Sequence, residues 1–185
     1  GKRGTEGKIA AIKYARINKI PFLGICFGMQ MAIIEFARNV LNIKTASSSE
    51  LNSKCTPVVG LIHEWKKDGK TIRGTNKDLG GTMRLGLYEA ELLNNSLIKS
   101  IYKTKSIKER HRHRYEVNMN FKKHFEKKGL IFSGNSPDKN LPEIIELKNH
   151  PWFIGVQFHP EFKSRPLSPH PLFSSFIKAT KNHKK

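Results

Sequence analysis

A short apolar run, a glycine-flanked cysteine and a periodic helix follow one another and constrain the fold of this chain most. Pro21 to Ile25 is typical of a buried strand, and Met29 to Leu41 places apolar residues at helical spacing. Between them, Cys26 lies in a Gly-x-Cys-x-Gly pattern. Glycines permit a tight strand-to-helix turn, and such a turn lifts the side chain above the sheet. The segment predicts an α/β fold with a nucleophile elbow, at which the helix N-terminus favours the thiolate. The alternative is a small cysteine that fills the core.

The rest of the chain adds helices and strands to this unit. An amphipathic helix is predicted over Glu6 to Ile17, so that helix, strand and helix alternate as in α/β proteins. Ala46 to Lys54 is polar and is predicted to be a loop, and turns are predicted at Asp68-Gly69 and 79–81. Further strands are predicted at 58–62, 83–92, 110–117, 130–133, 143–147 and 152–158, and further helices at 96–102, 121–128 and 171–179.

Composition excludes several classes of protein. The net charge of +19 would suit a nucleic-acid partner, but the lysines are spread along the chain and no aromatic platform or nucleic-acid motif accompanies them. No apolar run is long enough to cross a membrane. Cys26 and Cys55 do not make a disulfide framework, which favours a reducing, cytoplasmic location. We therefore expect neither a nucleic-acid nor a membrane partner.

A second motif offers a base for the cysteine. The apolar strand from Trp152 to Phe158 is followed at its carboxyl end by His159 and, two residues later, Glu161. Ligands of open α/β sheets bind beyond the carboxyl ends of strands, where Cys26 is also expected. If the backbone stays extended, His159 and Glu161 point to the same side. The carboxylate can then hold one imidazole nitrogen while the other faces the sulfur, which is the arrangement used for acyl transfer.

The two motifs, GICFGMQ at 24–30 and FHPE at 158–161, resemble those of the class I (triad) glutamine amidotransferases. Longer strings, such as GGTMRLG at 80–86 and RHRHRYEVN at 110–118, are similar to the glutaminase domains of the CTP synthase family. The likeness runs from Arg3 to Lys178. It implies one domain over residues 1–185, lacking its first strands, with an open, mostly parallel central sheet flanked by helices and an added antiparallel portion.

The resemblance also implies roles for individual residues. Cys26 matches a nucleophile that forms a glutamyl thioester, His159 its base and acid, and Glu161 the residue that orients the histidine. The backbone amide of Phe27 would donate to the oxyanion, and a second amide would come from a glycine pair upstream of Gly1. The residues implied to bind glutamine are Phe27, Gly28, Met29, Gln30, Glu50 and Arg114.

Further expectations concern partners. The family uses the released ammonia to convert UTP to CTP in a separate synthetase domain, where ATP and Mg²⁺ bind, and GTP is an allosteric effector. The full-length enzyme is expected to be a homo-oligomer. No cofactor is expected in this domain. A metal site at His111 and His113 is not predicted either, because the arginines that alternate with these histidines repel a cation. The alternatives are another class I amidotransferase, a γ-glutamyl hydrolase, or a non-catalytic regulatory module of the same fold.

Overall fold

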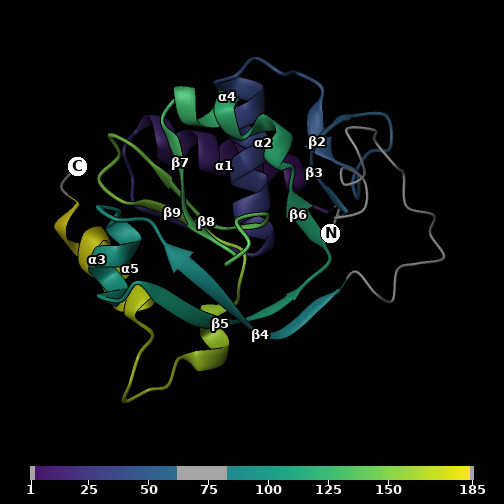
Figure 1. Ribbon diagram of the computed structural model, residues 1–185. Coiled ribbons are helices and arrows are strands. Elements are labelled where there is room, and N and C mark those ends of the chain that lie inside the picture. Colours follow the sequence, from purple (N-terminus) through teal and green to yellow (C-terminus); the bar gives the residue numbers. More distant parts are fainter. Residues whose placement is uncertain (1–2, 62–82, 184–185) are drawn as a thin grey trace.

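The computed structural model describes residues 3–61 and 83–183 (Figure 1). Within these residues, five α-helices accompany two sheets, one of six strands in the order β1-β9-β8-β7-β4-β5 and one of three in the order β2-β3-β6. The helices are α1 (Thr5–Ile17), α2 (Phe27–Asn39), α3 (Leu97–Tyr102), α4 (Lys122–Lys127) and α5 (Pro171–Asn182). The strands are β1 (Phe22–Ile25), β2 (Ala46–Ser48), β3 (Thr56–Leu61), β4 (Arg84–Leu92), β5 (Ser106–His113), β6 (Tyr115–Val117), β7 (Leu130–Asn135), β8 (Pro142–Leu147) and β9 (Phe153–Val156).

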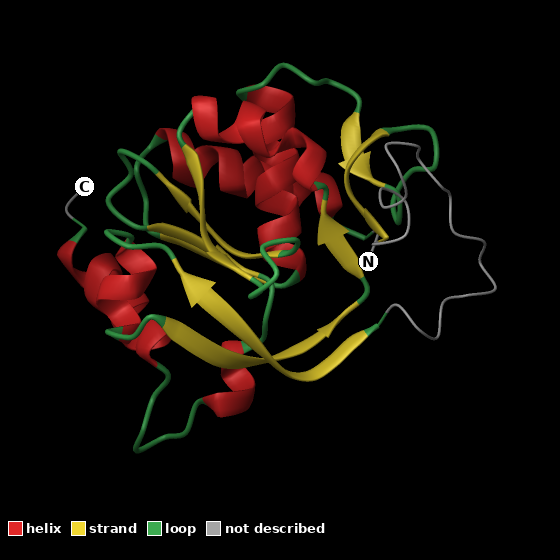
Figure 2. Ribbon diagram, viewed as in Figure 1, coloured by secondary structure: helices red, strands yellow, loops and turns green. Residues whose placement is uncertain are grey.

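Helices cover both faces of the six-stranded sheet (Figure 2). One apolar cluster joins α1, α2 and α4 to the sheet, with Ile33 and Phe125 completely buried at its centre. A second cluster joins α3 and α5 to the opposite face, around Ile98 and Leu172. The predicted α/β class is therefore confirmed. Among the described residues, no helix combines the length and the apolar character needed to cross a membrane.

The prediction of a mostly parallel central sheet is wrong for the described strands. In the six-stranded sheet only β1 and β9 pair in parallel, and the four other pairs are antiparallel. The physical reason lies in the connections, because β7, β8 and β9 follow one another through short turns, whereas parallel neighbours need a long crossover. The pairing of β1 with β9 joins segments about 130 residues apart and aligns Ile25 with Val156.

Two local predictions also need correction. Ala46–Ser48, expected in a loop, is the short strand β2, which pairs with β3. The strand expected over 110–117 is divided at Arg114 into β5 and β6, which belong to different sheets. The chain bends there because each half pairs with a different partner, β4 or β3. The predicted turns at 68–69 and 79–81 lie outside the described residues.

Candidate active site

Cys26 occupies the turn between β1 and α2, in the elbow conformation that the sequence predicts. Its backbone has φ 49° and ψ −103°, in the region that favours glycine. A Cβ at Gly24 would lie 2.9 Å from the carbonyl oxygen of Gly28, so the helix approaches the strand closely only because Gly24 has no side chain. A Cβ at Gly28 would meet nothing within 4 Å. The first glycine of the pattern is thus sterically required, and the second is not.

Burial dominates the ionisation of the Cys26 thiol. Desolvation raises its pKa to about 11, outweighing the hydrogen bonds from the Phe27 backbone and the Gln157 side chain, which lower it. The start of α2 does favour the thiolate, through the Phe27 N–H, but burial outweighs this effect. A thiol at this position needs a base before it can act as a nucleophile.

His159 and Glu161 lie together, as predicted, although not on an extended strand. β9 ends at Val156, and Pro160–Lys163 is a 3-10 turn that brings the carboxylate to the imidazole. His159 Nδ1 donates to Glu161 Oε1 at 2.6 Å, because a carboxylate only accepts. The other ring nitrogen, Nε2, is buried and has no hydrogen-bond partner among the described residues. Nε2 therefore keeps a lone pair available for a proton.

The parallel pairing of β1 and β9 brings the cysteine and the histidine to one edge of the sheet. Both strands end there, at Ile25 and Val156, and the Cys26 N–H donates to the Val156 carbonyl at 2.7 Å. His159 is fixed in turn by a hydrogen bond from its N–H to the Arg110 carbonyl at 2.8 Å. The edge corresponds to the carboxyl end of the strands, where α/β folds place their ligands.

A cavity of about 340 Å³ opens beside Cys26. It holds an acidic and a basic side chain, Glu50 and Arg114, which suits a ligand that carries both an ammonium and a carboxylate. The lining residues are Cys26, Phe27, Gln30, Glu50, Met83, His113, Arg114 and Tyr115. Gly28 and Met29, also expected at the substrate, are not among them, and the Met29 side chain is completely buried in the core.

A buried ion-pair cluster supports the wall of this cavity. Arg84 on β4 contacts Glu116 on β6 at 3.2 Å and Glu143 on β8 at 2.7 Å, so one guanidinium joins the two sheets. Burial raises the pKa of both carboxyls, that of Glu116 to about 8. The sequence did not reveal this cluster, because its members come from three separate strands.

His111 and His113 are buried beside the ion-pair cluster, and their rings are hydrogen-bonded at 2.9 Å. Desolvation, aided by the positive charge of Arg84, lowers their pKa values to about 2 and 3, so both rings are neutral at pH 7. Across the described residues, no group of three or more His, Cys, Asp or Glu side chains is arranged to hold a metal ion.

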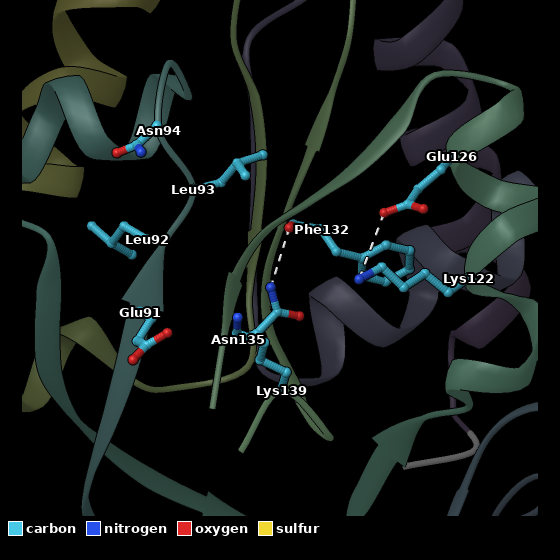
Figure 3. Close-up of a pocket in the computed structure, with 9 residues that line it drawn as sticks. All are labelled: Glu91, Leu92, Leu93, Asn94, Lys122, Glu126, Phe132, Asn135 and Lys139. Carbon is cyan, nitrogen blue, oxygen red and sulfur yellow. Dashed lines mark hydrogen bonds and ion pairs between the residues drawn. The ribbon is translucent and has the colours of Figure 1, made fainter. Parts of the chain in front are cut away.

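A second hollow, of about 350 Å³, lies away from Cys26 between β4, β7 and α4 (Figure 3). Two of its polar side chains contact other groups of the protein: Lys122 lies 3.7 Å from Glu126, and Asn135 Nδ2 donates to the Phe132 carbonyl at 3.3 Å, whereas Asn135 Oδ1 is buried without a hydrogen-bond partner in the described part of the chain. None of the predicted site residues lines it. The chemistry therefore concentrates at the cysteine.

Comparison with known proteins defines the class. The family model for "Glutamine amidotransferase class-I" matches residues 1–179. The chain belongs to the class I glutamine amidotransferases.

Within that family, CTP synthases are among the relatives of this chain. The CTP synthase of Pelagibacter ubique (strain HTCC1062) is 78% identical over 184 residues, which cover 100% of this chain and 34% of that protein. The CTP synthase of Zymomonas mobilis is 61% identical over 180 residues, covering 97% and 33%. The glutaminase domain of Trypanosoma brucei CTPS, solved with bound acivicin, matches with a TM-score of 0.86 and 35% identity, over 100% of this chain and 69% of that one. The chain is a glutaminase domain of the CTP synthase type, and it spans about a third of the length of these curated relatives.

Four residues of the site were given no individual role by the sequence motifs: Gln157, His113, Tyr115 and Met83. All four lie inside or beside the strings shared with the CTP synthase family, which was the available signal. Their proximity to Cys26 depends on strand pairing between distant segments, which local patterns do not report.

Proposed function

We propose that this chain hydrolyses the side-chain amide of glutamine through a thioester on Cys26. The observation that supports this most is the cavity in which the Cys26 thiol shares walls with Glu50 and Arg114. A carboxylate can pair with the α-ammonium of glutamine, and a forked guanidinium with its α-carboxylate. The side-chain amide would then reach the sulfur.

The proposed steps assign roles to His159, Glu161 and the Phe27 backbone, which lie at the same end of the sheet as Cys26. His159 Nε2 takes the proton of the Cys26 thiol, and the thiolate adds to the amide carbon. The backbone N–H of Phe27 is a donor for the resulting oxyanion. The imidazolium, held by Glu161, then protonates the leaving nitrogen, so that ammonia departs and the thioester remains. Water, deprotonated by His159, adds to the thioester and releases glutamate and the thiol.

The product ammonia would be used elsewhere in the same polypeptide. Since the relatives are CTP synthases about three times as long as this chain, we propose that a synthetase domain consumes the ammonia to convert UTP to CTP with ATP and Mg²⁺. GTP as effector, a homo-oligomeric complete enzyme and a cytoplasmic location belong to the same proposal.

The direct test is to incubate the complete protein with glutamine and GTP and to measure ammonia and glutamate. Equal amounts of the two products are expected, and CTP should form when UTP and ATP are added. Cleavage of γ-glutamyl peptides in preference to glutamine would instead indicate a γ-glutamyl hydrolase. Release from neither substrate would indicate a non-catalytic module of this fold.

Replacing Arg114 by alanine should raise the KM for glutamine by about 10- to 100-fold, the loss expected when a charged hydrogen-bond partner is removed. Steady-state kinetics of the complete protein with glutamine would measure it, and CTP formation driven by added ammonia should be unchanged. Arg112→Ala is the matched control, because Arg112 lies two residues earlier and is exposed on β5. Equal loss of both activities in Arg114→Ala would indicate a folding role.

A further inference from the structure

Gln157 lies beside the nucleophile, although no part of the proposed reaction has used it. It follows β9 directly, is completely buried, and neighbours Cys26 because Ile25 and Val156 are paired in parallel. Its side-chain Nε2 lies 3.7 Å from Cys26 Sγ, within the hydrogen-bonding range of sulfur. Its own N–H donates to the Glu143 carbonyl at 2.8 Å, which fixes the backbone.

The orientation of the Gln157 amide follows from its neighbours. Gln30 Nε2 lies 2.9 Å from the carbonyl oxygen of Tyr115, an atom that only accepts hydrogen bonds, so the Gln30 amide must present its NH₂ group there. The same NH₂ group lies 3.3 Å from Gln157 Oε1 and donates to it. With its oxygen thus engaged, Gln157 turns its own NH₂ group toward the sulfur of Cys26. The Tyr115 carbonyl therefore decides the direction of both amides.

We infer that Gln157 is a positioning residue for the nucleophile, which holds the Cys26 sulfur with an N–H···S hydrogen bond and stabilises the thiolate before it attacks. The inference rests on the proposed function and adds a residue to the same site. Hydrogen bonds to a charged acceptor are stronger than those to a neutral one, so the Gln157 donor favours the thiolate over the thiol. Because the Gln157 side chain is completely buried, water does not compete for its N–H donor.

The same chain of amides connects the sulfur to the wall of the substrate cavity. Gln30 and Tyr115 both line the cavity, and Gln157 joins them to Cys26 from behind. This donor opposes the desolvation that raises the pKa of Cys26 to about 11. Without it, the Phe27 backbone amide would be the remaining donor to the sulfur among those that lower the pKa.

The test compares wild type with Gln157→Met, which keeps the length of the side chain and removes the donor. In the complete protein, the rate of Cys26 alkylation by iodoacetamide would be followed against pH, with the modified peptide quantified by mass spectrometry. In Gln157→Met, we expect the midpoint of the alkylation rate against pH to move up by about one pH unit. Below the midpoint, this shift corresponds to a tenfold loss of the thiolate form of Cys26. In glutamine hydrolysis kcat should fall by about tenfold and KM should change by less than about twofold.

Gln157→Glu is the second variant, since its ionised carboxylate would repel the thiolate and move the midpoint upward as well. Ser133→Ala is the matched control for loss of a buried polar side chain in the same sheet, away from the sulfur, and it should leave the midpoint unchanged. Unchanged midpoints in both Gln157 variants would overturn the inference. Loss of folding in both Gln157 variants would also overturn the inference, because it would show that Gln157 is needed for the folded structure rather than for the nucleophile. Since alkylation needs no glutamine, this result stands apart from a failure of the proposed hydrolysis, which would appear as no ammonia from the wild type.

Discussion

Replacing Cys26 by alanine should lower the release of ammonia from glutamine by about four orders of magnitude or more, because no thioester can form without the sulfur. Alanine carries a Cβ as cysteine does, so the backbone at φ 49° keeps its conformation and the fold should be retained. Ammonia production by the complete protein would be measured with glutamine in excess. CTP formation from added ammonia should persist, which separates the loss of hydrolysis from a loss of structure.

Cys26→Ser sharpens this test. A serine hydroxyl occupies nearly the same volume, but it ionises far less readily than a thiol, which burial already holds at a pKa of about 11. We therefore expect Cys26→Ser to be almost as inactive as Cys26→Ala, although its glutamine cavity is intact. Undiminished ammonia release from either variant would exclude Cys26 as the nucleophile, whatever the rest of the cavity binds.

The sequence predicted the elements around the cysteine better than it predicted how they are paired. The strand, elbow and helix from Phe22 to Asn39 are set by local periodicity and by the steric need for Gly24, and both are readable along the chain. The direction of strand pairing was not readable in this way. Nor was the bend at Arg114, which arises because its two sides pair in different sheets.

The same distinction applies to the candidate site: residues in local motifs could be predicted, and contacts between distant strands could not. Cys26, His159 and Glu161 could be predicted because each belongs to a short motif that follows an apolar strand and has a recognisable chemical role. Glu50 and Arg114 came from family resemblance, and the structure places both at the cavity. The amide chain and the ion-pair cluster were not predicted, because their hydrogen bonds and ion pairs cross between strands that are far apart in sequence.

Replacing Arg84 by methionine should destabilise the protein by about 3–5 kcal/mol, the cost of removing the hydrogen-bonding and charged partner of two buried carboxyl groups. The Arg84 side chain is 8% exposed, and the two carboxylates that it contacts, on Glu116 and Glu143, are completely buried. Methionine preserves much of the buried volume, so the loss reports on charge rather than packing. Urea unfolding at pH 7, followed by fluorescence and circular dichroism, would measure the free energy of unfolding.

The destabilisation should also depend on pH in a definite direction. Glu116 has a raised pKa, about 8, even beside Arg84, and removal of that positive charge would raise it further. A carboxyl whose pKa is raised in the folded state contributes stability at low pH that is lost as the pH rises. Above pH 8 the Glu116 carboxyl of the wild type ionises next to Arg84. In Arg84→Met the same carboxyl either stays protonated or becomes a buried charge without a partner. The difference between the two proteins should therefore widen from pH 8 to pH 9.5.

The matched control is the triple variant Arg84→Met, Glu116→Gln, Glu143→Gln, which removes the charges together with their partner and should recover most of the lost stability. Glutamine kinetics add a second measurement. Glu116 lies on β6 between Tyr115 of the cavity wall and Val117, which pairs with β3, so the single variant should loosen the wall and raise the KM for glutamine. If Arg84→Met were as stable as the wild type at every pH, the ion-pair cluster would not stabilise the contact between the two sheets. The cavity wall would then be held by apolar packing alone.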